Sequence, residues 1–168
     1  MSVGRERRCT SAEAAAKHRV DFHLDMRVFI DTNLWAYRLD RREPGKSAFI
    51  RDWLRKLALE HDIVISTQVM IELRSVVTRK LKPALSWQDT RATLEALASL
   101  EVVPTNANLV LDAHELAQSE GLSWFDALIV EAAIRSGCAR LYSEDMGHGR
   151  VFGELSVMNP FREAEGVS

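Results

Sequence analysis

Cysteine is scarce in this chain of 168 residues, which contains only Cys9 and Cys138. Two cysteines cannot build a disulfide scaffold or a cysteine-rich zinc module. The chain also lacks the run of roughly 18 apolar residues that a transmembrane helix needs, because its best run, Ala127–Val130, stops at Glu131. The arginine-rich N-terminus is followed by no apolar segment, which excludes a secretory signal. We therefore expect a cytoplasmic protein without a membrane segment.

A strong excess of charge of one sign is absent as well. The chain has 22 Lys and Arg against 24 Asp and Glu, a formal net charge of −2 at pH 7. This balance excludes a broadly basic nucleic-acid binder but allows a local basic patch. Hydrophobic residues make up 46% and charged residues 27%, as in globular proteins, so wholesale disorder is excluded. The length suits one domain with its own core.

The chain divides into a short polar start and a long patterned remainder. We expect residues 1–25 to be a loosely ordered N-terminal extension, followed by a domain over 26–168. The alternative is an upstream start codon, with Met26 as the natural start of the protein. From Met26 onward, short apolar strands alternate with amphipathic helices, which predicts an α/β fold with a parallel sheet flanked by helices. The predicted strands lie at 28–30, 63–65, 102–103, 139–142 and 155–158. The predicted helices cover about 47–59 and 108–119, and three more begin at Ser66 or Thr67, Ser86 and Ser123.

Four acidic residues stand where such a fold binds ligands. Asp31 directly follows the first predicted strand, and Asp145 comes shortly after the strand at 139–142. Glu72 and Asp126 lie on predicted helices beside apolar residues. Since ligands bind outside the carboxyl ends of parallel strands, we expect these four side chains to converge on one edge of the sheet.

Each acid also has a purely structural interpretation. Asp31 can cap the next helix, Asp126 can complete a capping box with Ser123, Glu72 can extend into solvent, and Asp145 can be a turn residue. Together, however, four carboxylates in one cleft repel one another unless a cation lies among them. Oxygen ligands without Cys or His suit Mg²⁺ or Mn²⁺, and such an ion fits metal-assisted hydrolysis of phosphodiesters.

Four segments resemble the motifs of PIN-domain ribonucleases: Met26–Trp35, Ile71–Leu73, Leu122–Ile129 and Leu141–Met146. Their order and spacing agree across residues 26–161, and the ending Val157–Phe161 is similar too. The nearest subgroup is the VapC-type toxins of bacterial type II toxin–antitoxin systems. The resemblance implies a three-layer α/β/α fold and an endoribonuclease that cleaves RNA with metal-activated water, leaving a 3′-hydroxyl and a 5′-phosphate.

The resemblance also implies roles for individual residues. Asp31, Glu72, Asp126 and Asp145 would form an acidic quartet that holds one or two Mg²⁺ or Mn²⁺ ions, with Asn33 and Ser143 as accessory polar residues. Asp145, rather than its neighbour Glu144, takes the fourth acidic position by register. The implied partners are an RNA substrate, a small antitoxin protein and a second copy of the chain in a homodimer. Family members usually start near the position of Met26, so residues 1–25 depart from the pattern.

Basic residues gather in two segments. Residues 38–56 hold seven Lys or Arg against three acids, and residues 74–82 hold Arg74, Arg79, Lys80 and Lys82 without any acid. We predict that these segments flank the acidic cleft and bind RNA phosphates, with an affinity that falls steeply with salt. A solvated helix face is the alternative.

Two other functions stay open. A phosphatase would use Asp31 as a nucleophile, but enzymes resembling haloacid dehalogenases need a second Asp two residues later, where this chain has Asn33. A PIN-like module that only binds partners would share the fold without the chemistry. Stabilisation by Mn²⁺ distinguishes this module from an enzyme with an intact acidic quartet.

Overall fold

The computed structural model describes residues 26–165, so our expectation for residues 1–25 lies outside the described residues. Six strands in this part form one sheet in the order β3-β2-β1-β4-β6-β5. Strand β5 is antiparallel to β6, and every other neighbouring pair is parallel. The strands are β1 (Met26–Ile30), β2 (His61–Ser66), β3 (Glu101–Val103), β4 (Arg140–Tyr142), β5 (Val151–Phe152) and β6 (Leu155–Met158).

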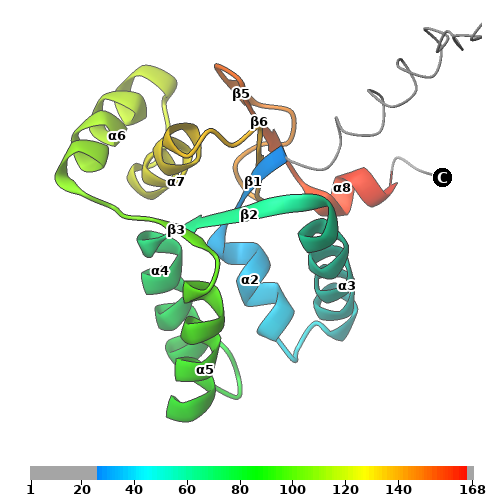
Figure 1. The fold of residues 1–168 in the computed structure, drawn as a ribbon. Helices are drawn as coiled ribbons and strands as arrows, with labels where there is room; N and C mark the ends of the chain where they lie inside the picture. Colours follow the sequence, from blue (N-terminus) through cyan, green and yellow to red (C-terminus); the bar gives the residue numbers. More distant parts are fainter. Residues whose placement is uncertain (1–25, 166–168) are drawn as a thin grey trace, which may run out of the picture.

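Helices cover both faces of this sheet. Figure 1 shows α2 to α5 on one side of the strands and α6 with α7 on the other, which confirms the three-layer α/β/α architecture. The bounds are α2 (Thr32–Leu39), α3 (Pro44–Glu60), α4 (Thr67–Arg79), α5 (Trp87–Ala98), α6 (Ala107–Glu120), α7 (Trp124–Arg135) and α8 (Pro160–Glu165). None of the helices within 26–165 is both long and apolar enough to cross a membrane.

The core forms where the sequence concentrates apolar residues. Val28, Phe29 and Ile30 of β1 are fully buried, as expected for a central strand covered on both faces. Several helices begin at side-chain caps: the Ser66, Ser86 and Ser123 hydroxyls each accept a hydrogen bond from the backbone amide three residues later. These caps are the three helix starts that the sequence predicts.

Three elements were not predicted: α2, β5 and α8. The residues after β1 were expected to form only a turn or cap; Asp31 does cap, but the chain continues into α2. Strand β5 has two residues and pairs with β6 across a tight turn at Gly153, whose φ is 61°. The helix expected at 47–59 is longer, beginning at Pro44, because proline suits the first helical turn.

The strand order reverses between β1 and β4. From β1 the chain crosses through α2 and α3 to β2 on one side, and it later returns from β3 through α6 and α7 to β4 on the other. Ligand sites of open α/β sheets lie at such a switch point, outside the carboxyl ends of the strands. The residues that follow β1 and β4 are Asp31 and Ser143.

Candidate active site

Asp31 lies at the carboxyl end of β1 and is only 7% exposed. One of its oxygens accepts the Thr32 amide at 2.6 Å, and the other accepts the Ser143 hydroxyl at 2.8 Å. Burial raises the pKa of Asp31 from 3.8 to about 7; the two hydrogen bonds oppose this rise, and the carboxylates of Asp145 and Glu72 add to it. No ion pair joins Asp31 to a Lys, Arg or His side chain of residues 26–165. Asp31 is thus a buried carboxylate without a positive partner.

Asp145 reaches the same place from the end of β4. The Asn33 amide nitrogen donates to the Asp145 carboxylate and also to the Ser143 hydroxyl oxygen, at 3.3 Å. Ser143 therefore connects Asp31 with the side chain that binds Asp145. The pKa of Asp145 is raised, mainly by burial and then by Glu144 and Asp126, while the Asn33 hydrogen bond lowers it.

Glu72 joins Asp31 from α4. One of its oxygens accepts the Thr32 hydroxyl at 2.9 Å, and the other accepts the Gln68 amide at 2.7 Å. Because the Thr32 backbone binds Asp31 while its side chain binds Glu72, the two carboxylates lie on either side of one residue. Gln68 also donates to the Phe125 carbonyl at 3.2 Å, which ties α4 to the start of α7.

Asp126 completes the set from the first turn of α7. It is half-buried, and its amide donates to the Ser123 hydroxyl at 3.2 Å. It directly follows Phe125, whose carbonyl accepts from the same Gln68 amide that donates to Glu72, so Asp126 lies at the same edge of the sheet as Glu72. Its negative charge also adds to the raised pKa of Asp145. The structure therefore brings all four predicted acids, together with Asn33 and Ser143, to one edge of the sheet.

The four carboxylates do not form a finished metal cage. Among the described residues, no group of three His, Cys, Asp or Glu side chains lies close enough to hold an ion. Instead, the neutral side chains of Thr32, Asn33 and Ser143 lie between them, as mutual repulsion would favour.

The donor set nevertheless fits a hard cation. Two buried side-chain oxygens at this edge, Asn33 Oδ1 and Gln68 Oε1, have no hydrogen-bond donor in the part of the chain described. By chemical type, unpartnered amide oxygens and the four carboxylates are an all-oxygen set of donors, which Mg²⁺ and Mn²⁺ prefer. The residues present therefore suit such an ion.

Two residues of this edge, Thr32 and Gln68, were not predicted from the sequence. Thr32 directly follows Asp31, and a hydroxyl beside a strand-end acid was a usable signal. Gln68 precedes Glu72 by one helical turn, so the spacing of i and i+4 could have paired them. The contact of Gln68 with Phe125 joins helices far apart in sequence and has no local signal.

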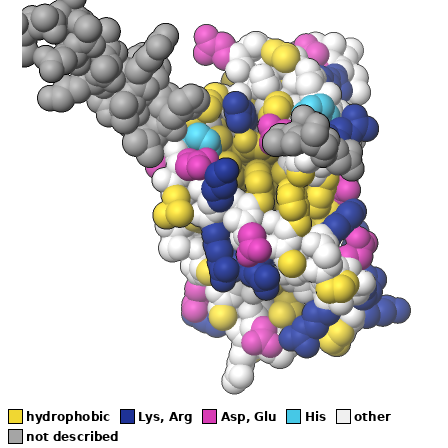
Figure 2. All heavy atoms as spheres, turned by 90° about the vertical axis from the view of Figure 1, so that its right-hand side faces the viewer, with side chains coloured by type: hydrophobic (Ala, Val, Ile, Leu, Met, Phe, Trp, Pro, Cys, Tyr) yellow, Lys and Arg dark blue, Asp and Glu magenta, His cyan; other side chains and the backbone are white. Residues whose placement is uncertain are grey.

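The predicted RNA-binding residues follow Glu72 along the chain: Arg74 is two residues beyond it, and the other three lie at and after the end of α4. Arg74, Arg79, Lys80 and Lys82 are all exposed, on α4 and the turn after it. Arg79 is seven residues beyond Glu72, about 10 Å along the helix axis. Figure 2 shows further Lys and Arg side chains gathered on the side of the molecule that carries α3 and α8. On α3, the exposed Arg51, Arg55 and Lys56 belong to the other predicted basic segment.

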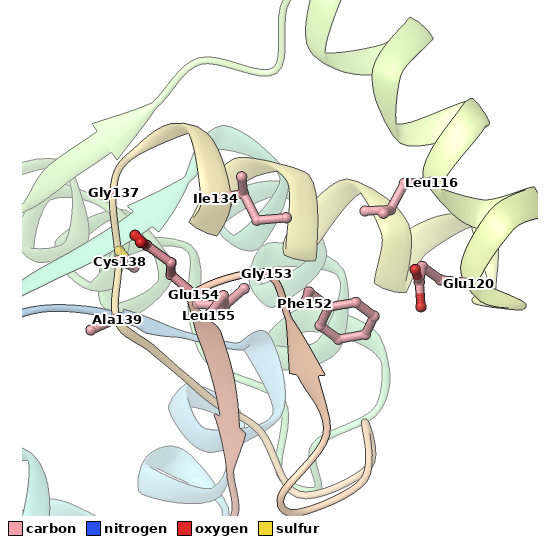
Figure 3. A pocket seen from close by; sticks show the side chains of 10 residues that line it. All are labelled: Leu116, Glu120, Ile134, Gly137, Cys138, Ala139, Phe152, Gly153, Glu154 and Leu155. Atoms are coloured by element: carbon pink, nitrogen blue, oxygen red, sulfur yellow. The ribbon is translucent and has the colours of Figure 1, made fainter.

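Two hollows in the structure are separate from the acidic edge. A cavity of about 410 Å³ lies beside the amino end of β4, with Ile134, Phe152 and Leu155 among its mostly apolar walls (Figure 3). A groove of about 530 Å³ lies between α2, α4 and α5, with Trp35, Leu73 and Leu97 along it and Arg38 and Arg41 at its border. Neither is lined by any of the four predicted acids.

Comparisons with known proteins agree with the α/β/α fold described above. The family model described as PIN domain matches residues 28–152. No curated protein matches the chain. VapBC2 from Rickettsia felis, solved bound to a DNA fragment of its promoter, is similar at 22% identity with a TM-score of 0.58, covering 80% of this chain and 98% of that one.

Two further solved structures are similar. A toxin–antitoxin complex from Klebsiella pneumoniae shares 17% identity with a TM-score of 0.56, covering 76% of this chain and 94% of that one. VapBC-1 from nontypeable Haemophilus influenzae shares 16% identity with a TM-score of 0.53, covering 80% of this chain and 98% of that one. At these identities the likeness shows a common fold.

Proposed function

The chain belongs to the PIN domain family, and from that premise we propose that it is a Mg²⁺- or Mn²⁺-dependent endoribonuclease, the VapC-type toxin of a bacterial toxin–antitoxin pair. It would act on RNA in the cytoplasm. The observation that carries the proposal is the environment of Asp31. It is a buried carboxylate at the switch point of the sheet, with two further carboxylates near it and no ion pair to a cation within residues 26–165. Burying an ionised carboxylate costs free energy, and a bound cation that balances its charge reduces that cost.

Two kinds of residue would form the site: those that hold the metal and those that orient its ligands. Asp31, Glu72, Asp126 and Asp145 would hold the metal, while Ser143 and Thr32 keep the Asp31 oxygens oriented. Asn33 holds the side chain of Asp145 in the site. A divalent ion in such a site activates water and stabilises the charge that develops on the attacked phosphate.

A protein antitoxin is the partner that the solved relatives support, because structures sharing this fold are toxin–antitoxin complexes. The groove between α2, α4 and α5, which has both apolar and charged residues along it, offers a surface for a segment of such a partner. Exposed Ile71 and Phe125, next to two of the acids, offer an apolar surface for the proposed homodimer.

The test is cleavage of total cellular RNA by the purified protein with Mg²⁺, with Mn²⁺ and with EDTA. Asp31→Asn is the inactivating variant, and Asp62→Asn is the matched control, since Asp62 is exposed at the opposite end of the parallel strands. We expect discrete fragments that require metal, persist in the control and disappear with Asp31→Asn.

A second readout distinguishes the other functions. Millimolar Mn²⁺ should raise the melting temperature of the wild-type protein, because the ion binds only the folded state. Absence of both cleavage and stabilisation would favour a module that only binds partners. Stabilisation with release of phosphate from a phosphomonoester, but no RNA fragments, would favour the phosphatase.

A further inference from the structure

Glu144 is the neighbour of Asp145 in sequence, but its side chain has different partners. One Glu144 oxygen accepts the Lys46 ammonium group at 3.1 Å, and the other accepts the Tyr37 hydroxyl. The Asp145 carboxylate instead accepts the Asn33 amide. Two adjacent acids are thus divided between two environments, one with a cation and one without.

Lys46 is held on several sides. Its ammonium group lies 3.7 Å from Glu43, 4.4 Å from the centre of the Tyr37 ring and 5.2 Å from the centre of the Phe161 ring. The Tyr37 and Phe161 rings meet edge to face, with centroids 5.8 Å apart. The hydrogen bond to Glu144 is the main cause that raises the pKa of Lys46, which keeps the group charged.

This cluster of Tyr37, Lys46 and Glu144 joins α2, α3 and the segment after β4. A second contact holds the same segment, because the Asn159 side chain donates a hydrogen bond to the Glu144 carbonyl at 3.4 Å. Residues on both sides of Glu144 belong to the acidic edge: Ser143 donates to Asp31, and Asp145 accepts from Asn33. Fixing Glu144 therefore fixes the backbone from which both neighbours extend.

We propose that Tyr37 and Lys46 are positioning residues of the acidic site, which hold Glu144 so that Ser143 and Asp145 face Asp31. The inference rests on the proposed function and adds to it two residues that touch none of the four acids. With the cluster broken, the segment after β4 loses one of its anchors, and Ser143 and Asp145 lose their fixed orientation toward Asp31. This loss of orientation weakens the metal site, as loss of outer-shell partners commonly does.

The experiment measures the Mn²⁺ concentration that gives half of the maximal rise in melting temperature. The variants of the full chain are Tyr37→Phe, which keeps the ring and removes only the hydroxyl, and Lys46→Met, which keeps the length and removes the charge. Lys56→Met is the matched control, because it removes one positive charge from the same helix at an exposed position. We expect the Mn²⁺ midpoint to rise about tenfold in both test variants and to stay at the wild-type value in the control.

Two further measurements separate positioning from a general effect on stability. In a Glu144→Ala background, adding Tyr37→Phe or Lys46→Met should shift the midpoint little, since both residues act through Glu144. Lys46→Arg, which retains the ion pair, should lie closer to wild type than Lys46→Met.

The opposite results would overturn the inference. A lowered melting temperature with an unchanged Mn²⁺ midpoint would show that the cluster only stabilises the fold. Full additivity with Glu144→Ala would show that Tyr37 and Lys46 do not act through Glu144. A wild-type protein that neither responds to Mn²⁺ nor cleaves RNA would contradict the proposed function itself, so the two failures are distinguishable.

Discussion

In the metal-free protein, the ionised form of Asp31 destabilises the folded state, because its buried carboxylate is charged without a cation to balance it. Its pKa is about 7 in the folded chain against the ordinary aspartate value of 3.8, so the folded state binds the proton more tightly than the unfolded chain does. The free energy of unfolding should therefore fall as the pH rises from about 4 to about 7 and stay low above that. In EDTA at pH 8, we expect Asp31→Asn to melt at a higher temperature than wild type, although it is inactive. Asp62→Asn, measured by the same thermal melts, should follow the wild-type pH profile; an equal rise in both variants would contradict this assignment.

Ser143 has the opposite effect on Asp31, because its hydrogen bond favours the ionised carboxylate and lowers the pKa. Ser143→Ala should raise that pKa further, so that a larger fraction of Asp31 is protonated at neutral pH. We expect the Mn²⁺ affinity to fall about tenfold at pH 7 and to approach wild type at pH 9, measured by thermal shift. Ser99→Ala is the control, since that hydroxyl binds only a helix carbonyl. A loss of affinity that is equal at both pH values would show that Ser143 acts by geometry alone.

At this scale the sequence predicts the acids better than their partners. Asp31 could be chosen because a strand end is visible in the apolar pattern, and Asp126 because a serine cap places it in the first turn of a helix. The pairing of Glu72 with Thr32, and of Glu144 with Lys46, could not be predicted in the same way. Those contacts depend on how α2, α3 and α4 pack, which is a property of the tertiary structure rather than of local spacing.

At the scale of elements, two helices offer a matched comparison. Ser123 caps α7, which carries Asp126, and Ser86 caps α5, which carries none of the four acids. Both caps are exposed, and both are followed three residues later by an aspartate. Ser123→Ala and Ser86→Ala should each lower the free energy of unfolding by about 1 kcal/mol, measured by urea denaturation. Only Ser123→Ala should also weaken Mn²⁺ binding; equal Mn²⁺ midpoints would mean that the start of α7 does not position Asp126.

The elements that the sequence missed are those with the weakest local signal. Helix α2 has eight residues, and its buried Leu34 and Trp35 are adjacent rather than spread at helical spacing. Strand β5 has two residues and exists through its pairing with β6. The longer elements were predictable because each has an apolar pattern with a cap or glycine at its end, such as Gly121, which follows α6 with a φ of 62°.

At the scale of the whole molecule, the proposed function requires a chain of net charge −2 to bring a polyanion to a group of carboxylates. Local basic surfaces can do this, and two are present: the end of α4 with the turn after it, and the exposed face of α3. On α3, Arg51 and Arg55 both pair with Asp52, which offsets part of their charge. No ion pair is found for Arg79, Lys80 or Lys82 within residues 26–165. The α4 surface is therefore the better phosphate-binding candidate.

The salt dependence of RNA binding tests this choice between surfaces. In an Asp31→Asn background, which prevents cleavage, replacing Arg79, Lys80 and Lys82 by Ala should reduce the slope of log K against log salt by about 2, since each phosphate contact on single-stranded RNA contributes about 0.7. The matched control replaces Arg51, Arg55 and Lys56, which removes the same formal charge from α3. If only the α3 variant lowers the slope, the RNA path crosses α3 instead. If both lower it equally, the protein attracts RNA through its overall field, and neither surface contacts phosphates at defined positions.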